Sequence, residues 1–243
     1  MKKPKLVMVG NGMAGVRTLE ELLKLAPDLY DITVFGAEPW PNYNRIMLSP
    51  VLTGEQTVQD IILNDENWYA DNGIRLLLNR KVCRIDRGRR LVHADDGTVV
   101  QYDKLLLATG SNPFVLPIPG KDLNGVVTFR DIHDVDRMIQ AAGTQRHAVV
   151  IGGGLLGLEA AAGLRARGMA VSVVHLSECL LERQLDKEAA NLLRKTLEGR
   201  GLQFLMPKQT EAILDDGHGN VAAVTFKDGQ SVPADLVVMA VGI

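Results

Sequence analysis

The chain has 243 residues, with 27 lysines and arginines against 29 aspartates and glutamates, and its formal net charge is −2. That length suffices for one large or two ordinary domains, and the near-neutral charge argues against general attraction to nucleic acid or anionic membranes. The two cysteines and five histidines show no metal-ligand spacing, so neither a disulfide framework nor a metal site is expected.

The basic start of the chain, Met1–Lys5, resembles the first part of a signal peptide. The apolar run behind it is too short for such a peptide, and no segment approaches the roughly 20 apolar residues of a membrane span. We therefore expect a soluble, cytoplasmic protein.

The first predicted unit is a strand at 6–9, a glycine-rich turn and a helix at 14–25. The turn has the spacing G-x-G-x-x-G and consists of Gly10, Asn11, Gly12, Met13, Ala14 and Gly15. In this context the first glycine permits a tight turn, the second lets backbone approach a pyrophosphate, and the third lets helix and strand pack. The helix N-terminus adds free N–H donors and partial positive charge. This pattern predicts a dinucleotide-binding turn.

A second parallel strand is predicted at 32–35, and Glu38 follows it. An acid near this place commonly accepts from ribose hydroxyls, so we assign Glu38 to the adenosine ribose, the alternative being that it faces water. The segment 39–50 holds three prolines and no clear period, which predicts an irregular loop of the kind that is often functional. Arg45 in this loop is a candidate for a pyrophosphate or flavin contact, the alternative being an ordinary surface arginine.

The rest of the first half predicts a short helix at 65–71 and a strand at 74–78. Three short strands between 82 and 100, with the turn signal Asp96-Gly97, predict a small antiparallel insert. A buried strand at 104–108 then leads into proline- and glycine-rich linker residues. We place the first domain at 1–115.

The second half repeats the first. A helix at 132–142 and a strand at 147–151 precede a second glycine turn, and a helix at 155–167 follows it. The binding residues predicted in and after this turn are Gly152, Gly154, Leu155, Leu156 and Gly157. Two such turns in one chain predict two bound dinucleotides. Further predicted elements are a strand at 170–174, a helix at 186–200 and antiparallel pieces at 203–206, 211–214 and 221–226.

Selection between NADH and NADPH depends on the end of the strand at 170–174. His175 stands where a carboxylate would favour NADH by repelling a 2′-phosphate. Histidine imposes no such penalty, Arg183 lies nearby in sequence, and Glu178 is a candidate for the ribose hydroxyls. The sequence leaves the choice open, with a slight preference for NADH.

The last apolar run, 236–240, repeats the pattern of 104–108. Each has an aspartate, an apolar strand, then a small residue and glycine, which are Gly110 and Gly242 in the two halves. We predict an NAD(P)H-binding domain at 116–234 and a strand at 235–243 that returns to the first domain. The predicted fold class is α/β, with two Rossmann-like domains of the FAD/NAD(P)-binding fold, each carrying a small antiparallel β insert.

Several segments together resemble the N-terminal flavin region of the NAD(P)H-dependent nitrite reductase large subunit, in the two-dinucleotide-binding-domain flavoprotein superfamily. They are GNGMAG, ITVFGAEP, YNRIMLSP, YDKLLLATGS, GGGLLGLEAA and LERQLD. The resemblance implies FAD in the first domain, NADH or NADPH in the second, and hydride transfer between them. In the intact enzyme it implies iron–sulfur and sirohaem centres that receive the electrons and reduce nitrite to ammonia.

The resemblance also implies site residues. The first turn and Glu38 would bind FAD, and Asn44, Arg45 and Ser49 would lie by the flavin. Val82 would contact the adenine side, and Ala108, Thr109, Gly110 and Gly242 complete the predicted cofactor contacts. Glu159 would reach toward the nicotinamide as the candidate catalytic residue. His175 and Arg183 are the candidates beside the NAD(P)H ribose.

The sequence departs from the resemblance in two places. Pro50 replaces a lysine that follows the same loop in rubredoxin and ferredoxin reductases, and a redox Cys-x4-Cys motif is absent after the second strand. Relatives also continue beyond the position of Ile243, so we expect a C-terminally truncated chain that retains FAD weakly. The alternative functions are a stand-alone NAD(P)H-dependent ferredoxin or rubredoxin reductase and a non-catalytic nucleotide-binding fragment.

Overall fold

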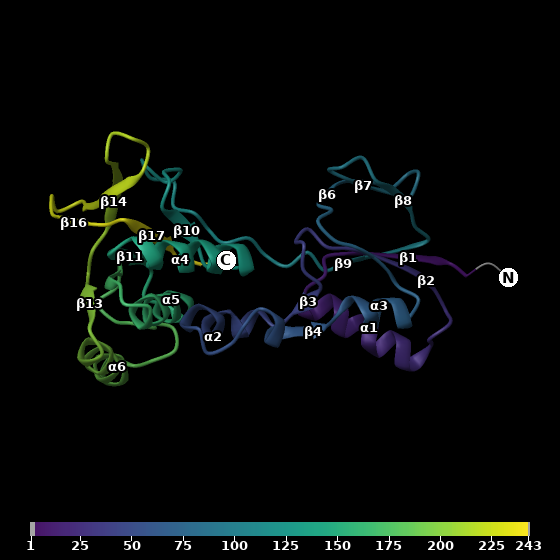
Figure 1. Cartoon of the computed structure of the whole chain (residues 1–243), viewed down its shortest axis with the longest axis horizontal. Coiled ribbons are helices and arrows are strands. Elements are labelled where there is room, and N and C mark those ends of the chain that lie inside the picture. Colours follow the sequence, from purple (N-terminus) through teal and green to yellow (C-terminus); the bar gives the residue numbers. More distant parts are fainter. Residues whose placement is uncertain (1–2, 243) are drawn as a thin grey trace. The chain divides into compact units, whose positions relative to one another are not determined.

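A computed structural model describes residues 3–242, which divide into two compact units (Figure 1). Within the described residues, the first unit comprises 3–45 and 58–111, and the second comprises 46–57 and 112–242. The chain passes from the first unit to the second for the last time between Ser111 and Asn112, close to the boundary predicted at residue 115. The sequence did not predict that residues 46–57 belong to the second unit. Within residues 3–242, no helix is long and apolar enough to cross a bilayer.

The first unit is built on a four-stranded parallel sheet in the order β5-β2-β1-β9. Its strands are β1 (Lys5–Val9), β2 (Asp31–Phe35), β5 (Arg75–Leu77) and β9 (Lys104–Leu107). The two inner strands read as apolar runs because both of their faces are covered. The helices are α1 (Met13–Leu25) and α3 (Glu66–Asp71).

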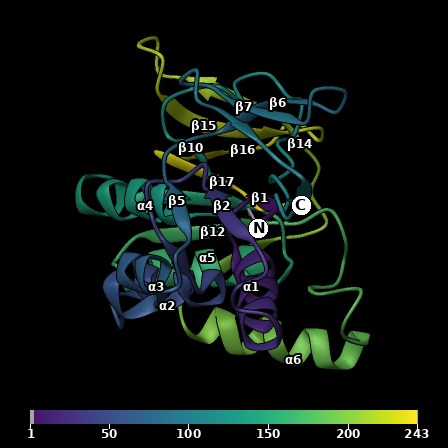
Figure 2. The same cartoon turned by 90° about the vertical axis from the view of Figure 1, so that its right-hand side faces the viewer.

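The first sheet lies between a layer of helices and a small antiparallel sheet (Figure 2). Alternate residues of its strands belong to two different core clusters, one on each face. Leu6 and Met8 of β1 pack with Leu19 of α1 and Tyr69 of α3. Val7 and the remaining side chains of the opposite face pack on a three-stranded antiparallel sheet. Its strands are β6 (Val82–Asp86), β7 (Leu91–Ala94) and β8 (Val99–Gln101), which confirms the predicted insert.

The second unit contains a five-stranded parallel sheet in the order β10-β17-β11-β12-β13. Its strands are β10 (Val126–Thr128), β11 (His147–Ile151), β12 (Ala170–Val174), β13 (Leu202–Leu205) and β17 (Leu236–Met239). The prediction that residues 203–206 pair antiparallel is wrong, because β13 pairs parallel to β12 at the sheet edge. Its alternating burial is common to both orientations, so the pattern alone could not distinguish them.

This sheet also lies between a helical layer and a small antiparallel sheet (Figure 2). The helices are α4 (Ile132–Thr144), α5 (Leu155–Ala166) and α6 (Lys187–Gly199), and the small sheet contains β14 (Thr210–Asp215), β15 (Val221–Phe226) and β16 (Ser231–Pro233). Val149 and Ile151 of β11 pack against Val224 and Phe226 of β15. The two units therefore have the same three layers in the same order.

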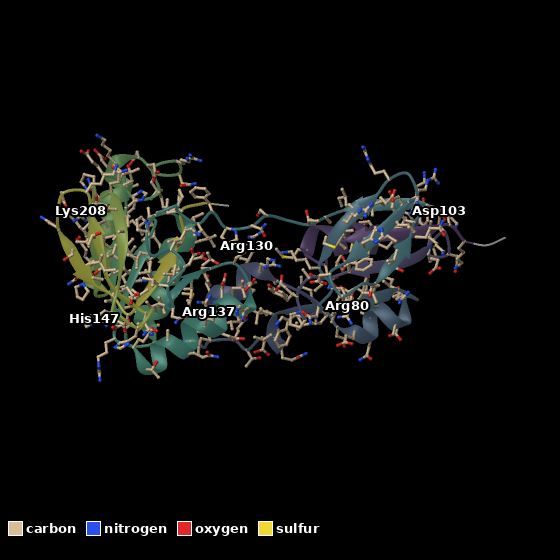
Figure 3. The ribbon with its side chains drawn as sticks, turned by 90° about the horizontal axis from the view of Figure 1, so that it is seen from above. Arg80, Asp103, Arg130, Arg137, His147 and Lys208 are labelled. Carbon is tan, nitrogen blue, oxygen red and sulfur yellow. The ribbon has the colours of Figure 1, made fainter. Side chains whose placement is uncertain are left out.

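The closing strands show this repetition most directly. In the first unit the Asp103 carboxylate accepts from the Lys5 N–H at 2.7 Å, and β9 then pairs parallel to β1. In the second, the Asp235 carboxylate accepts from the His147 N–H at 2.9 Å, and β17 pairs parallel to β11. Figure 3 shows Asp103 and His147 of these two pairs.

The predicted return of residues 235–243 to the first domain is wrong for β17. This strand lies between β10 and β11 in the second sheet, where it takes the place that β9 takes in the first. Asp235 and the apolar strand after it match this position, because they repeat Asp103 and the apolar strand β9. Ile243 lies outside the described residues.

The proline-rich segment 39–50 contains regular structure that the sequence did not predict. It includes β3 (Asn42–Tyr43), which pairs with β4 (Ile62–Asn64), and the short 3-10 helix Arg45–Met47. The helix α2 (Leu48–Thr53) then begins and includes Pro50 at its third position. Proline is tolerated there because the N–H groups of a first helical turn have no intrahelical partner. A second 3-10 helix, Gln59–Ile61, precedes β4.

The helix α2 packs on α5 within the second unit. A Cβ atom on Gly163 of α5 would lie 2.5 Å from the side chain of Leu52, so the missing side chain permits the close approach. The Arg167 guanidinium, just beyond α5, donates to the Leu52 carbonyl and, at 3.4 Å, to the Val51 carbonyl. The Val51 carbonyl also accepts from the Gly54 N–H at 3.1 Å, so Arg167 adds to the cap at the end of α2 and gives the Leu52 carbonyl a donor.

Candidate dinucleotide-binding sites

The three glycines of the first turn differ in whether the fold requires a residue without a side chain. Gly10 has φ +106°, and a Cβ there would lie 2.1 Å from the Ala108 carbonyl oxygen. A Cβ on Gly15 would lie 2.9 Å from the Ala108 side chain, so this glycine brings α1 close to the sheet. Gly12 has ordinary extended geometry, with φ −84° and ψ 174°, and its Cβ would meet no atom of residues 3–242 within 4 Å. The fold requires the first and third glycines but not the second.

The second turn repeats this distinction. Gly152 has φ +124°, and its Cβ would lie 2.2 Å from the Ala240 carbonyl oxygen. A Cβ on Gly157 would lie 2.0 Å from the Gly152 carbonyl oxygen. Gly154, at φ −83° and ψ −179°, again has open space where its Cβ would be. Ala108 and Ala240 thus play the same part in the two units.

Both helices that follow these turns begin without a side-chain cap and without an acidic residue in the first turn. Their first N–H groups therefore remain available, and the helix dipole adds positive potential at the same place. A backbone that is left open by a glycine beside such an N-terminus fits an approaching pyrophosphate. The chain therefore presents two cradles for phosphate-bearing ligands, one in each unit.

The remaining residues of the two turns differ in their surroundings. The Asn11 amide oxygen accepts from the Tyr69 hydroxyl at 2.7 Å, and burial raises the pKa of Tyr69 to about 12. Met13 is half-buried and Ala14 is exposed at the start of α1. In the second turn, Leu155 and Leu156 are 58% and 38% exposed, which leaves apolar side chains beside the cradle.

Glu38 lies at the centre of a small polar cluster in the first unit. It accepts from the Tyr43 hydroxyl at 2.7 Å and pairs with Arg45, whose guanidinium carbon lies 5.0 Å from the centre of the Tyr43 ring. Separate roles were predicted for Glu38 and Arg45 from the sequence, and Tyr43 was not identified. Asn44 is fixed between them by its N–H, which donates to the Ile61 carbonyl at 2.8 Å.

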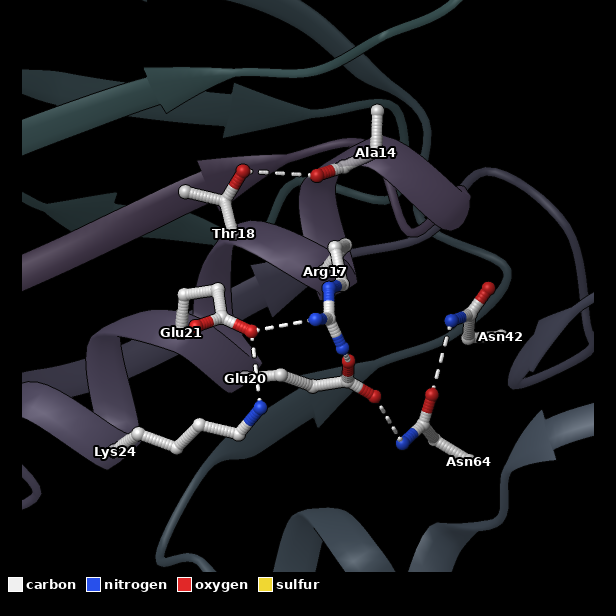
Figure 4. Close-up of polar contacts among 8 residues, drawn as sticks. All are labelled: Ala14, Arg17, Thr18, Glu20, Glu21, Lys24, Asn42 and Asn64. Carbon is white, nitrogen blue, oxygen red and sulfur yellow. Dashed lines mark hydrogen bonds and ion pairs between the residues drawn. The ribbon is translucent and has the colours of Figure 1, made fainter.

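Two buried amides hold this cluster's strand in place (Figure 4). The Asn42 side chain donates to Asn64 at 3.0 Å, and Asn64 donates to Glu20 of α1 at 3.2 Å. The Asn64 hydrogen bond, followed by that of Arg17, holds the pKa of Glu20 below its usual value. The strand β3 that carries Tyr43 is thereby fixed to the helix that follows the first glycine turn.

Ser49 and Glu159 meet in the second unit, although 110 residues separate them. The Ser49 hydroxyl donates to the Glu159 carboxylate at 2.6 Å, at the place where α2 packs on α5. The roles expected for them, beside the flavin and toward the nicotinamide, stay predictions.

The other predicted contact residues are distributed over both units. Val82 is half-buried at the start of β6, Ala108 touches the first turn through its carbonyl, and Thr109 and Gly110 are exposed after β9. Gly242 has φ +135°, and its carbonyl accepts from the Phe114 N–H at 2.8 Å. Their contacts with cofactors stay predictions.

His175 lies directly against the second turn. Its Nδ1 accepts from the Gly153 N–H at 3.1 Å, and its Nε2 lies 3.0 Å from the Glu182 carboxylate. Sequence reasoning considered Glu178 and Arg183 in this region and did not identify Glu182. The spacing of seven residues between His175 and Glu182 gave no signal, because a loop of irregular geometry brings them together.

Two units that each present a parallel sheet, a glycine turn and an uncapped helix N-terminus define a protein with two dinucleotide-binding domains. Residues 4–243 match the pyridine nucleotide-disulphide oxidoreductase family, and the chain belongs to that family. Both of its cysteines, Cys83 and Cys179, are free. The predicted fold class is confirmed, and the expected FAD and NAD(P)H agree with the family.

Over its whole length the chain is 56% identical to the nitrite reductase (NAD(P)H) of Bacillus subtilis, of which it covers 30%. It is 49% identical to the assimilatory nitrate reductase electron transfer subunit of the same organism and covers 31% of it. These matches confirm the predicted resemblance to nitrite reductase. The chain thus spans about a third of the length of these relatives.

A rubredoxin-NAD(+) reductase of Ectopseudomonas oleovorans is 32% identical over 98% of the chain, which covers 61% of that protein. Among solved structures, the covalent putidaredoxin reductase–putidaredoxin complex is similar over all of the chain and 59% of its own, with TM-score 0.90 and 29% identity.

Proposed function

We propose that this chain is the electron-input part of a nitrite reductase, in which NAD(P)H bound by the second unit reduces FAD bound by the first. The observation that carries the proposal is the open space at Gly12 and Gly154. Among the described residues, no atom lies close enough to require a glycine at either position, whereas a backbone that must approach a pyrophosphate does require one.

The residues of the chain bind and orient, because the bound cofactors supply the hydride chemistry. The first turn and the N-terminus of α1 would hold the FAD pyrophosphate, with the cluster of Glu38, Tyr43 and Arg45 as its candidate polar neighbours. The second turn and the N-terminus of α5 would hold NAD(P)H, and Leu155 and Leu156 would exclude water beside it. Glu159, held by Ser49, is the candidate for the nicotinamide end.

The proposal extends to electron acceptors that the chain itself does not contain. The similarity to nitrite reductases supports transfer onward to iron–sulfur and sirohaem centres and the reduction of nitrite to ammonia in a cytoplasmic enzyme. The similarity to rubredoxin and ferredoxin reductases supports a second candidate, a stand-alone reductase of a small iron–sulfur protein. A solved relative in complex with putidaredoxin is consistent with either kind of iron–sulfur partner.

The test is a flavin titration followed by a turnover assay. The purified chain is mixed with FAD, and the absorption spectrum between about 350 and 500 nm is followed for the bound form. Loaded chain is then supplied with NADH or NADPH and ferricyanide, and nucleotide oxidation is measured. We expect weak but detectable flavin binding in the titration, and steady oxidation by the loaded chain. Failure to bind FAD would contradict the proposal, and binding without oxidation would support the non-catalytic alternative.

A second assay separates the two candidate acceptors. Ferricyanide is replaced by a rubredoxin or a two-iron ferredoxin, with nitrite as a parallel acceptor and ammonia as its readout. Efficient reduction of the small protein would favour the stand-alone reductase. The nitrite reductase assignment predicts poor reduction of that protein and no ammonia from this chain alone.

A further inference from the structure

The ring of His175 is fixed by the second glycine turn. Its Nδ1 accepts the Gly153 N–H, and a ring nitrogen that accepts carries no hydrogen. The hydrogen of the neutral ring is therefore on Nε2, which lies 3.0 Å from a Glu182 carboxylate oxygen. The backbone of the turn thus makes Nε2 the donor nitrogen of His175, and the acceptor is the Glu182 carboxylate.

The loop that carries Glu182 is fixed to the same turn by a second contact. The Leu181 N–H donates to the Gly153 carbonyl at 3.2 Å, so both backbone groups of Gly153 contact this part of the chain. A Cβ on Gly153 would lie 2.8 Å from both the His175 ring and the Leu180 side chain. These contacts hold the backbone of the loop against the turn at the residues directly before Glu182.

The carboxylate of Glu182 remains accessible to a ligand. Its side chain is 45% exposed, whereas that of His175 is only 12% exposed. A carboxylate has about four acceptor positions on its two oxygens, and His175 and the backbone N–H of Glu182 itself use two of them. Its own backbone N–H is the main reason that the pKa of Glu182 is lowered, with smaller contributions from His175 and Arg183, so it is ionised at neutral pH.

We infer that Glu182, positioned by His175, accepts the adenosine ribose hydroxyls of the nicotinamide dinucleotide and thereby selects NADH over NADPH. This inference rests on the proposed function of the second unit. Dinucleotide-binding domains commonly use an acid at the end of the second strand for these hydroxyls, and here that place holds His175. The histidine instead directs a carboxylate from the following loop. A 2′-phosphate would bring like charge against this carboxylate, whereas a ribose diol would donate to it.

The experiment measures binding directly, without flavin chemistry. NAD⁺ and NADP⁺ are titrated into the full chain by isothermal titration calorimetry, and the ratio of their Kd values is determined. We expect the wild-type chain to bind NAD⁺ at least about tenfold more tightly than NADP⁺. Glu182→Gln keeps the side-chain shape and removes the charge, and we expect it to reduce that ratio by about tenfold. Glu211→Gln, the same change on an exposed acid of β14 in the same unit, should alter the ratio less than about twofold.

His175 is tested as a positioning residue by the same ratio. His175→Leu removes the donor to Glu182 and should lower the ratio, and His175→Gln, which retains an amide donor, should restore part of it. Thermal unfolding of each variant shows whether it is folded.

The outcomes separate this inference from the proposed function. If neither dinucleotide binds the wild-type chain, the nucleotide-binding function and the inference both fail. If NAD⁺ binds but Glu182→Gln leaves the ratio unchanged, the inference alone is overturned. Tighter binding of NADP⁺ by the wild-type chain, abolished by Arg183→Gln, would overturn it as well and would show that Arg183 recognises a 2′-phosphate.

Discussion

Gly152 and Gly154 stand two residues apart, yet an added methyl group would act differently at each. At Gly152 the backbone is left-handed and a carbonyl oxygen occupies the Cβ position. At Gly154 the backbone is extended and the Cβ position is open. The first glycine is needed for folding, whereas the second is needed only if something binds.

Stability measurements on two single variants can test this difference. We expect Gly152→Ala to lower the free energy of unfolding by about 3 kcal/mol or more, because strain at positive φ adds to the clash with the Ala240 carbonyl. Gly154→Ala should stay within about 1 kcal/mol of the wild-type chain. Urea denaturation followed by circular dichroism gives both values. Equal losses in the two variants would show that Gly154 also has a structural role.

Tyr69 provides a second prediction, through its raised pKa. Its hydroxyl keeps its proton in the folded chain up to about pH 12, whereas the unfolded chain loses it near pH 10. The folded state therefore holds more protons in this interval, and the contribution of Tyr69 to stability falls as pH rises from 10 toward 12.

Tyr69→Phe should cost about 1 kcal/mol at neutral pH, because the hydroxyl no longer donates to Asn11. Between pH 9.5 and 11.5 the wild type should then lose up to about 2 kcal/mol relative to the variant, so the difference closes and the variant becomes the more stable chain near the upper end of this interval. Denaturant unfolding at stepped pH measures the gap, with Tyr30→Phe as the control. A gap that stays constant over this interval would contradict the assigned pKa.

At the scale of elements, the sequence correctly predicted the elements whose residue types are compatible with only one backbone geometry. The glycine turns are recognisable because only glycine fits the crowded bend, and the antiparallel insert because Asp96-Gly97 specifies a turn. The helix α2 was missed because Pro50 is compatible with either a loop or a first helical turn. The orientation of β13 and the contact of His175 with Glu182 were missed because they depend on tertiary packing.

The packing of α2 on α5 gives a prediction at this scale. Arg167→Ala removes the donors to the Leu52 and Val51 carbonyls, and we expect a loss of about 1–3 kcal/mol in the free energy of unfolding. Limited proteolysis should also cleave segment 46–57 faster, because the end of α2 is no longer held. Arg194→Ala, which breaks an exposed pair with Glu198 within α6, is the control and should cost less than about 0.5 kcal/mol. Unchanged proteolysis of segment 46–57 would show that Gly163 packing alone holds α2.

At the scale of the whole molecule, the chain consists of two versions of one architecture. Each unit has a parallel sheet between helices and a small antiparallel sheet, an aspartate before the closing strand, and an alanine carbonyl against the first glycine. Differences between the units therefore lie in what surrounds each cradle. The first has the cluster of Glu38, Tyr43 and Arg45, and the second has His175 with Glu182.

This repetition predicts that the two ligand sites can be inactivated separately. Gly12→Ala places a methyl group in the first cradle, and we expect at least about tenfold weaker FAD binding with NAD⁺ binding unchanged. Gly154→Ala should weaken NAD⁺ binding by a similar factor and leave FAD binding intact. Both variants should remain folded, because neither added Cβ would meet an atom of the described part of the chain within 4 Å. Calorimetric titration of each variant with each ligand supplies the four measurements. If Gly12→Ala weakened only NAD⁺, or if either variant weakened both ligands equally, the assignment of one dinucleotide to each unit would be wrong.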